Sequence, residues 1–395
     1  MLKNSLKCQI FLGKLTMFRQ MPIILALVIA TIIAFGNFIP TIAAQYLFGI
    51  SISIKSLIIF LLPIIIFGLL YKAAVNLAKD ASKIILLILA AVVISNTITT
   101  SLSQFLGIWI YKFDMSLTIP DESTSLAAIS FFEFEALIPN HIAMFSGIVF
   151  GILSAKIIPI YAEKIGSTLE KIVHKLLAVI TFLIPLFVAG FIIKLQYDGI
   201  ITQIIQDYTI IFAIIAIAQF GYISLLYFVF NKLNIANTLS SIKNMLPAAL
   251  SGFSTMSSAA SMPLTLIGTE RNAQNKDLVH TVVPATVNIH LIGDCIAIPC
   301  FAFAILKNYD LMQPHLFTYL IFTGYFVLAK FSVAGIPGGG ILVMLPILEQ
   351  YLGFNAEMLS LITALYILFD PVITSANVLG NGALAKIIDT ITYKK

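Results

Sequence analysis

The sequence predicts an all-α integral membrane protein with eight transmembrane helices and two re-entrant helical hairpins. Composition is the first observation behind this prediction: 59% of the 395 residues are hydrophobic and 10% are charged, against about 45–50% and about 25% in soluble domains. A single soluble core stops growing at roughly 250–300 residues, so a mean hydropathy of +1.02 requires lipid as a solvent. The other two observations are long apolar stretches and two apolar segments that small residues interrupt.

Eight stretches are apolar over a length that suits a membrane-spanning helix. A hydrocarbon core of about 30 Å takes about 20 residues in a helix. The polar and basic segment Met1–Gln20 precedes the first stretch, and no signal-peptide cleavage site with a soluble domain follows it, so we expect this stretch to be retained as a span. The expected spans are Pro22–Pro40, Ser56–Tyr71, Ile84–Leu106, Leu137–Ala155, Leu176–Ile193, Thr209–Phe230, Val279–Leu306 and Met358–Ile388.

Basic residues set the expected orientation. When the eight spans alternate with the N-terminus inside, the cytoplasmic segments hold all of the 23 Lys and Arg residues except Lys55, Lys112, Lys194, Lys307 and Lys330. Lys and Arg concentrate in the cytoplasmic loops of membrane proteins. The pattern therefore predicts a protein of the bacterial inner membrane with both termini in the cytoplasm. The net charge of +5 lies mainly in these loops and gives no reason to expect a nucleic-acid partner.

Two further apolar segments are each interrupted by a run of small residues. Met245–Ile267 surrounds Ser251–Ser261, and Leu316–Leu352 surrounds Ser332–Gly340. Neither run can cross lipid, because its backbone groups would lack hydrogen-bond partners. Buried inside protein, such a tip can direct N–H groups at an anion or carbonyls at a cation, and paired interrupted segments indicate a transporter binding site. The alternative is that each run is a loop or a small-residue contact between helices.

Three motifs follow one another from about residue 250 onward: Ser257–Thr265 (SSAASMPLT), Gly335–Gly340 (GIPGGG) and Asp370–Asn381 (DPVITSANVLGN). In order and chemistry they resemble the serine-rich first hairpin, the Gly-x-Pro-Gly-x-Gly second hairpin and the last span of the dicarboxylate/amino acid:cation symporter family, the glutamate-transporter relatives. In layout the resemblance covers roughly residues 20–390. It implies an inverted-repeat transporter that forms a homotrimer and binds a small-molecule substrate.

The resemblance also implies a division of the chain into two parts. Residues 1–235 would form the scaffold and the subunit contacts, and residues 236–395 the transport core, with the third and sixth spans as candidates for contact with that core. The core would hold the first hairpin at about 245–267, the seventh span at about 279–306, the second hairpin at about 316–352 and the eighth span at about 358–388.

Polar residues of the last span are expected to face a cavity. Thr374, Asn377 and Asn381 repeat at three- and four-residue spacing and share a helix face with Asp370; the alternative is interhelical hydrogen bonding that only holds the bundle. A carboxylate inside an apolar span costs several kcal/mol unless it is paired or hydrated. By resemblance, Asp370 takes a substrate ammonium group; the alternative is a kink residue before Pro371.

The resemblance assigns ligand roles to individual residues. Substrate would be bound by Ser257, Ser258, Ile336, Pro337, Gly338, Gly340, Asp370, Thr374 and Asn377. The coupling cation would be bound by Asn288, Asn377 and Asn381, with Na+ at Asn288 and Asn377.

Ala259 replaces the third serine of the family's first hairpin, and three positions in the seventh and last spans also depart from the family pattern. His290 stands where the seventh span of the family has an acid, and Ile373 where its last span has an arginine that reads an acidic side chain. Asn381 replaces a final sodium-binding Asp, as it does in dicarboxylate carriers of the family. These differences favour a neutral amino acid over glutamate or aspartate, and they leave Na+ and H+ as candidate coupling ions.

His290 and Asp294 lie four residues apart, so one helical turn would bring their side chains together. Imidazole titrates near neutrality, and ionisable groups inside a span often relay protons. We therefore predict a proton relay at this pair; the alternative is a structural pair that fixes a broken helix.

Together these observations predict a secondary active symporter, not an enzyme, that moves a small amino acid or a dicarboxylate with Na+ or H+ by alternating access and needs no cofactor. The alternative is a dicarboxylate or glutamate carrier coupled to H+. A channel could also use the two tips as a filter, but tips that differ in sequence suit alternating access better. An intramembrane aspartyl protease would need two aspartates; Tyr197–Asp198 and Gly293–Asp294 match its motifs incompletely.

Overall fold

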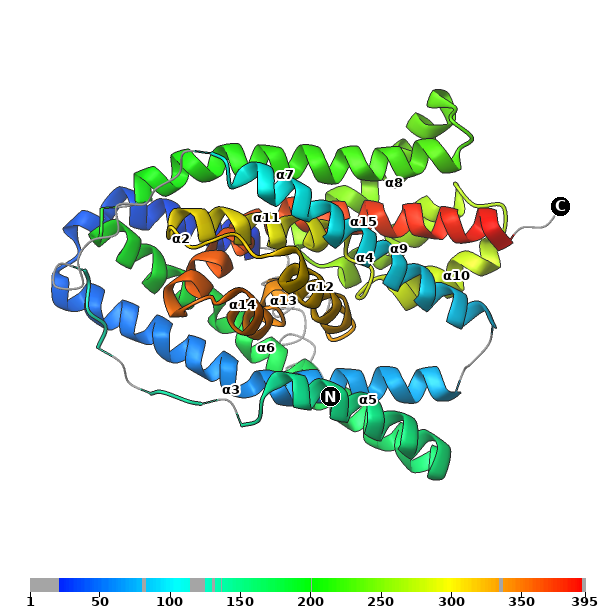
Figure 1. Cartoon of the computed structure of the whole chain (residues 1–395), viewed down its shortest axis with the longest axis horizontal. Coiled ribbons are helices and arrows are strands. Elements are labelled where there is room, and N and C mark those ends of the chain that lie inside the picture. The colour runs from blue at the N-terminus through cyan, green and yellow to red at the C-terminus, as the bar shows by residue number, and fades with distance from the viewer. Residues whose placement is uncertain are drawn as a thin grey trace, which may run out of the picture.

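Every regular element in the described part of the chain is helical (Figure 1). The computed structural model describes residues 21–79, 83–113, 125–129, 132–135, 137–199, 201–333 and 337–392. The elements are α2 (Met21–Phe35), η1 (Gly36–Phe38), α3 (Thr41–Lys79), α4 (Lys83–Ile110), α5 (Asn140–Ile157), α6 (Pro159–Tyr197), α7 (Ile201–Phe230), α8 (Ile235–Thr255), α9 (Ser258–Glu270), α10 (Lys276–Thr286), α11 (Ile292–Asn308), α12 (Leu316–Lys330), α13 (Gly339–Leu342), α14 (Leu345–Leu352) and α15 (Ala356–Thr392).

Several helices extend beyond the apolar stretches that the sequence analysis assigned to them. The second and fifth expected spans lie inside α3 and α6, which have 39 residues each. Both helices continue through an internal proline, Pro63 in α3 and Pro185 in α6, because neighbouring helices can satisfy the freed backbone groups. An apolar stretch predicts only the part of a helix that suits lipid. Backbone hydrogen bonds continue the helix into the polar residues on either side.

Five described helices are long and apolar enough to cross a membrane: Thr41–Asn76, Lys83–Ile110, Pro159–Tyr197, Ile201–Phe230 and Ala356–Thr392. The first and fourth expected spans correspond to the shorter apolar helices Ile23–Phe38 and Ile142–Ile157. The seventh expected span, Val279–Leu306, is divided between α10 and α11. An all-helical protein with several span-length apolar helices is therefore confirmed, while the count of eight spans stays a prediction.

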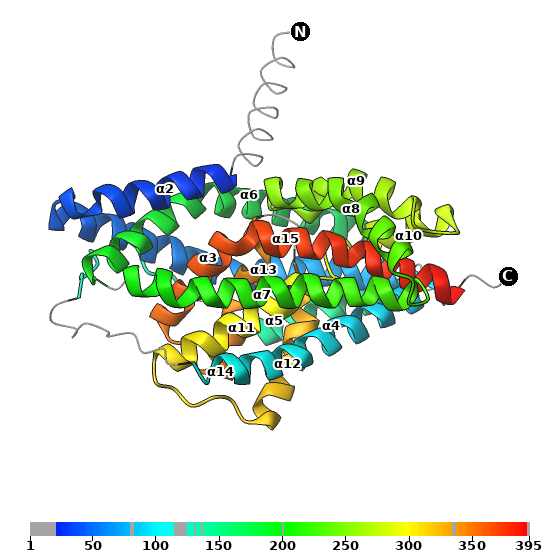
Figure 2. The ribbon, with the colours of Figure 1, turned by 90° about the horizontal axis from the view of Figure 1, so that it is seen from above.

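The helices pack in two groups. In Figure 1, α3 and α5 of one group lie along one long side and α7 of the other group along the opposite side, so that in the view from above α7 lies in front of the first group (Figure 2). In one group, α3 packs along α5 and α6, and α2 packs on α6. In the other, α4 and α7 pack on α11 and α15, and α15 also contacts α8 and α9. Phe212 of α7 stacks on Phe369 of α15 with ring centroids 4.7 Å apart, and Phe301 of α11 meets Phe369 at 6.0 Å. The third and sixth expected spans thus contact the C-terminal helices.

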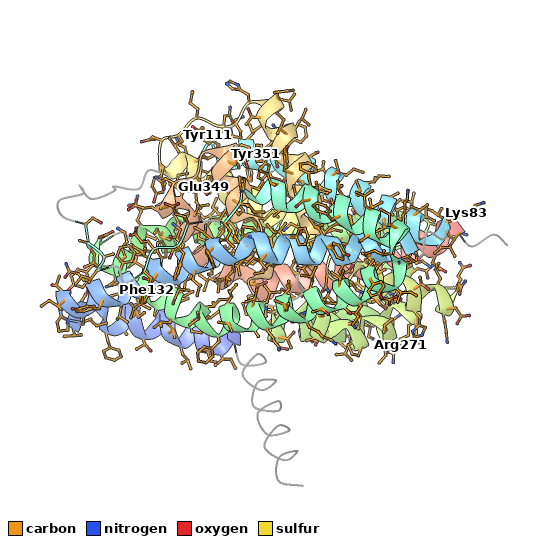
Figure 3. All side chains as sticks on the ribbon, turned by 90° about the horizontal axis from the view of Figure 1, so that it is seen from below. Lys83, Tyr111, Phe132, Arg271, Glu349 and Tyr351 are labelled. Carbon is orange, nitrogen blue, oxygen red and sulfur yellow. The ribbon has the colours of Figure 1, made fainter. Side chains whose placement is uncertain are left out.

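Two basic residues at helix ends, Lys83 and Arg271, mark one end of the molecule, called here the basic end (Figure 3). Lys83 and Arg271 lie at the same end of the long axis, and Phe132 lies toward the other end (Figure 3). The C-terminal part of α15 is held at the basic end, because Asp389 accepts hydrogen bonds from the backbone N–H groups of Gln274 and Asn275. The loop between α9 and α10 and the end of α15 therefore lie on one side.

The two interrupted segments both fold back on themselves. In the first, α8 and α9 are joined at Met256, which has a left-handed backbone (φ 50°), and Ser257. In the second, α12 is followed by a tip that contains Pro337 and Gly338 and then by α13 and α14. The first segment ends near Asp389, at the C-terminal end of α15, whereas the second leads directly into the N-terminal end of α15. Because α15 is about 55 Å long at about 1.5 Å per residue, the segments enter from opposite ends.

Candidate functional site

The polar face of α15 is buried at the centre of the C-terminal helices. Asp370 is 2% exposed and Asn381 is fully buried. The hydroxyl of Thr374 donates to Asp370 Oδ1 at 2.7 Å, one turn along the helix. Asn377 accepts a hydrogen bond from the backbone N–H of Gly293 at 2.8 Å through its Oδ1. The face that helical spacing predicted for Asp370, Thr374 and Asn377 is therefore buried against other parts of the protein.

The tip of the second hairpin closes directly on Asp370. The backbone N–H of Gly338 donates to Asp370 Oδ2 at 2.8 Å. Gly338 has φ 71°, a left-handed conformation that glycine adopts without the strain of a Cβ. Pro337 and Gly340 lie in the same turn, and Gly340 is buried. Ile336, the remaining substrate residue expected in this hairpin, lies outside the described residues.

The first hairpin reaches α15 one turn further along. A Cβ at Gly252 would lie 3.2 Å from the carbonyl oxygen of Thr374, so the glycine permits a close approach of α8. Ser257 accepts a hydrogen bond from the N–H of Ala260 at 3.1 Å and thereby caps α9; a serine is a preferred residue at this position. Ser258 follows at the buried start of α9. Both hairpins thus reach the Asp370–Thr374 turn of α15.

A break interrupts the seventh span between α10 and α11, over Val287–Leu291. Asn96 of α4 holds it: its Nδ2 donates to the carbonyl of Ile289 at 2.8 Å, and its Oδ1 accepts from the N–H of Leu291 at 3.3 Å. Gln219 of α7 donates to the carbonyl of Gly293 at 2.9 Å. Asn96 of α4 therefore satisfies backbone groups that a continuous helix would have paired internally. Gln219 adds a contact from α7 at the start of α11.

Replacing Asn96 by alanine should destabilise this break. Asn96→Ala removes two hydrogen bonds and leaves buried backbone groups unpaired, which costs roughly 1–3 kcal/mol. We expect a lower Tm of the purified protein in detergent, with the exposed neighbour Thr97→Ala as the matched control. An Asn96→Ala Tm equal to that of Thr97→Ala would contradict the role of Asn96.

His290 and Asp294 do not meet as one helical turn would place them. Nε2 of His290 lies 2.8 Å from the hydroxyl oxygen of Ser95. The carboxylate of Asp294 instead contacts Lys330, Tyr366 and Asn377. The physical reason is that α11 begins at Ile292, so His290 precedes the helix and helical spacing does not apply. The expected direct contact is therefore wrong, and a proton-relay role for either residue stays a prediction.

Several polar atoms around the break are buried without a hydrogen-bond partner: Asn288 Oδ1, His290 Nδ1, and both Oδ1 and Nδ2 of Asn381. Buried polar groups are normally paired, so these atoms are suited to an exchangeable ligand such as water or an ion. Carbonyl-type oxygens near an unwound helix are the donors that Na+ takes in transporters. Asn288 and Asn381 thus fit a cation better than Asn377, whose side chain bonds to Gly293 and Asp294.

The structure also brings in residues that the sequence analysis did not select: Ser95, Asn96, Gln219, Lys330 and Tyr366. Two signals pointed toward some of them. Lys330 was one of the few basic residues outside the expected cytoplasmic segments, and α4 buries a polar series made of Asn96, Thr99, Thr100, Ser103 and Gln104. Neither signal identified the contact partners of Lys330 and Asn96, which lie elsewhere in the sequence.

Ile373, which occupies the position of the family's arginine, is fully buried. Its backbone carbonyl lies against Gly293, where an added Cβ would strike it. The apolar side chain of Ile373 therefore packs at this turn of α15, where an arginine would have supplied a positive charge.

Comparison with known proteins confirms the resemblance carried by the three motifs. The model of the Sodium:dicarboxylate symporter family matches residues 20–391. Excitatory amino acid transporter 1 of Mus musculus is 27% identical over 234 residues, or 57% of this chain and 42% of that protein. Excitatory amino acid transporter 3 of Mus musculus is 26% identical over 254 residues (63% and 47%), and neutral amino acid transporter A of Bos taurus is 31% identical over 175 residues (43% and 31%). The matches cover less than half the length of these relatives. Because the family model spans nearly the whole chain, the protein belongs to the sodium:dicarboxylate symporter family, a family of membrane transporters.

Proposed function

We propose that this chain is a secondary active symporter that moves a small amino acid, or a dicarboxylate, together with a cation by alternating access. The observation that carries the proposal is the hydrogen bond from Gly338 N–H to the buried carboxylate of Asp370. It places a hairpin tip over the charged group of an intramembrane helix, with the other hairpin one turn away. A tip that can exchange its bond to Asp370 for a substrate ammonium group is suited to gate the site.

In this proposal the chain has eight spans and two re-entrant hairpins, residues 1–235 form mainly the scaffold, and residues 236–395 form the transport core. The contacts of α4 and α7 with α11 and α15 favour counting the third and sixth spans with the core. The protein would act as a homotrimer in a bacterial inner membrane with both termini in the cytoplasm. The shared location of Lys83 and Arg271 at one end (Figure 3) supports that orientation.

A neutral amino acid is the favoured substrate. Asp370 supplies a partner for an ammonium group, and Ser257, Ser258, Pro337, Gly338, Gly340, Thr374 and Asn377 surround its turn or form the two tips. The buried Ile373 offers nothing to a second carboxylate. Relatives include both excitatory and neutral amino acid transporters. A dicarboxylate or glutamate carrier coupled to H+ is the second candidate, because the family description names dicarboxylates.

The family description also names sodium, and the unpartnered oxygens of Asn288 and Asn381 support a cation beside the break. Proton coupling through His290 or Asp294 is the alternative. The aspartates of a protease alternative are each paired with a lysine: Asp198 with Lys194 at 2.6 Å and Asp294 with Lys330 at 2.8 Å. Both aspartates are thus engaged in ion pairs, and the chain belongs to a family of transporters. Both observations favour transport over peptide hydrolysis.

Uptake by purified protein in liposomes tests the proposal. Labelled neutral and acidic amino acids and dicarboxylates are each offered with a sodium gradient alone and then with a proton gradient alone. We expect accumulation of a neutral amino acid above its equilibrium level with one of the two gradients, and empty liposomes as the control. Uptake that only equilibrates, regardless of either gradient, would contradict symport.

A further inference from the structure

A buried ion pair joins the second hairpin to the seventh span. Lys330 is the last residue of α12, and its ammonium nitrogen lies 2.8 Å from Oδ2 of Asp294 in the first turn of α11. The side chains are 0% and 1% exposed. The ring of Phe326, one turn earlier on α12, lies 4.6 Å from the same ammonium group, a distance that suits a cation–π contact. A carboxylate and an aromatic face therefore hold the lysine charge.

The carboxylate of Asp294 has further donors from α15. Its Oδ1 accepts from the hydroxyl of Tyr366 at 3.1 Å and from Nδ2 of Asn377 at 3.0 Å. Gly340 of the second hairpin lies so close that an added Cβ would strike the carboxylate. With donors on both oxygens, a cation could reach Asp294 only by displacing one of them.

The charges around the hairpin tips show what Lys330 contributes. Charged residues that are buried in the described part of the chain are Lys194, Asp294, Lys330, Asp370 and Asp389, and the side chain of Asp198 is 3% exposed. Lys194 pairs with Asp198, and Asp389 accepts backbone N–H groups at the basic end. Asp294, Asp370 and Lys330 remain, with two negative charges and one positive. Asp370 is therefore the acidic side chain of this group that has no basic partner, and we place the substrate ammonium group there.

We propose that Lys330 is the built-in counter-cation of the transport core, and that its ammonium group takes the place of a bound monovalent cation beside Asp294. The inference rests on the proposed function for the role of Asp370. A charge fixed to α12 cannot leave with the substrate, so Asp294 is excluded as a ligand of the coupling cation while the hairpin is closed. Because Lys330 and Asp294 lie on different helices, opening of the second hairpin would separate the two charges, and the pair favours the closed hairpin.

Removal of the lysine tests the inference, because the carboxylate of Asp294 should then bind a cation from solution. Lys330→Ala leaves the Asp294 carboxylate unpaired beside the space of the missing side chain. We expect a Tm lower by roughly 5 °C or more in choline chloride. NaCl at equal ionic strength should restore part of this loss in a concentration-dependent manner, since an ion that binds the folded state stabilises it by mass action. The sodium-induced rise in Tm should exceed that of the wild type.

Two companion variants separate a cation site from general destabilisation. Lys330→Met fills the space with an apolar chain, so its Tm should fall without recovery in NaCl. Asp294→Asn combined with Lys330→Met removes both charges and should recover most of the Tm lost by Lys330→Met alone. Lys307→Ala, at a half-buried lysine near the end of α11, controls for loss of a lysine elsewhere and should keep the wild-type response to sodium.

The proposal is overturned if Lys330→Ala responds to sodium as the wild type does, or if the double variant is no more stable than Lys330→Met. The second comparison still decides the matter when Lys330→Ala does not fold. Failure of the proposed function has a different signature, because it is read from uptake by the wild type, whereas this test is read from the Tm and its dependence on the ion.

Discussion

Replacing Asp370 by asparagine should strongly reduce concentrative uptake while the protein still folds and assembles. The carboxylate accepts hydrogen bonds from Gly338 N–H at 2.8 Å and from the Thr374 hydroxyl at 2.7 Å, and among the described groups near the hairpin tips it is the acidic side chain that has no basic partner. An asparagine keeps the shape but loses the charge that a substrate ammonium group would pair with. Hydrogen bonds to charged groups contribute about 1.5–3 kcal/mol, so binding should weaken by roughly tenfold to a hundredfold.

The measurement is initial uptake into liposomes under a fixed gradient, together with size-exclusion chromatography of the purified protein. Asp277→Asn, at an exposed aspartate of α10, is the matched control and should keep wild-type uptake. If Asp370→Asn takes up substrate at the wild-type rate, Asp370 is a structural kink residue before Pro371 and the ammonium role is wrong.

A methyl group added at Gly340 should both destabilise the protein and impair transport. A Cβ there would strike the carboxylate of Asp294 and the hydroxyl of Tyr366, which belong to α11 and α15. Overpacking of this kind costs typically about 1–3 kcal/mol. Since these two groups are hydrogen-bonded to each other at 3.1 Å, the displaced hairpin would also disturb the closed arrangement over Asp370. We expect Gly340→Ala to lower both the Tm and the rate of uptake.

Gly324→Ala, on the same hairpin, is a control for which we do not expect the Tm to fall. Gly324 lies within α12, and a Cβ there would meet nothing within 4 Å. Alanine is favoured over glycine inside a helix by about 0.5–1 kcal/mol, so Gly324→Ala should leave the Tm unchanged or raise it. Equal losses in both variants would mean that the hairpin tolerates no substitution and that the contact at Gly340 has no special role.

Local sequence patterns were sufficient to predict an all-helical membrane protein and several of its elements. Apolar stretches of span length predicted α4, α7 and the middle parts of α3, α6 and α15, because hydropathy reports the solvent that surrounds each helix. The runs of small residues predicted the two chain reversals, at Ser257 and at Pro337–Gly338, because buried irregular backbone requires small side chains and protein partners. The spacing of Asp370, Thr374 and Asn377 predicted their common face, since helical periodicity is a local property.

Contacts between residues of different helices depend on tertiary packing. His290 and Asp294 are four apart in sequence, yet the break before Ile292 directs His290 to Ser95 of α4 and leaves Asp294 to Lys330 of α12. Asn96 belongs to a helix almost two hundred residues before the break that it holds. Such pairs depend on how helices cross and how deeply each turn is buried, and neither quantity is contained in the periodicity of one segment. The charge balance around Asp370 therefore follows from the packing of α11, α12 and α15, because only packing brings the ammonium group of Lys330 to a carboxylate.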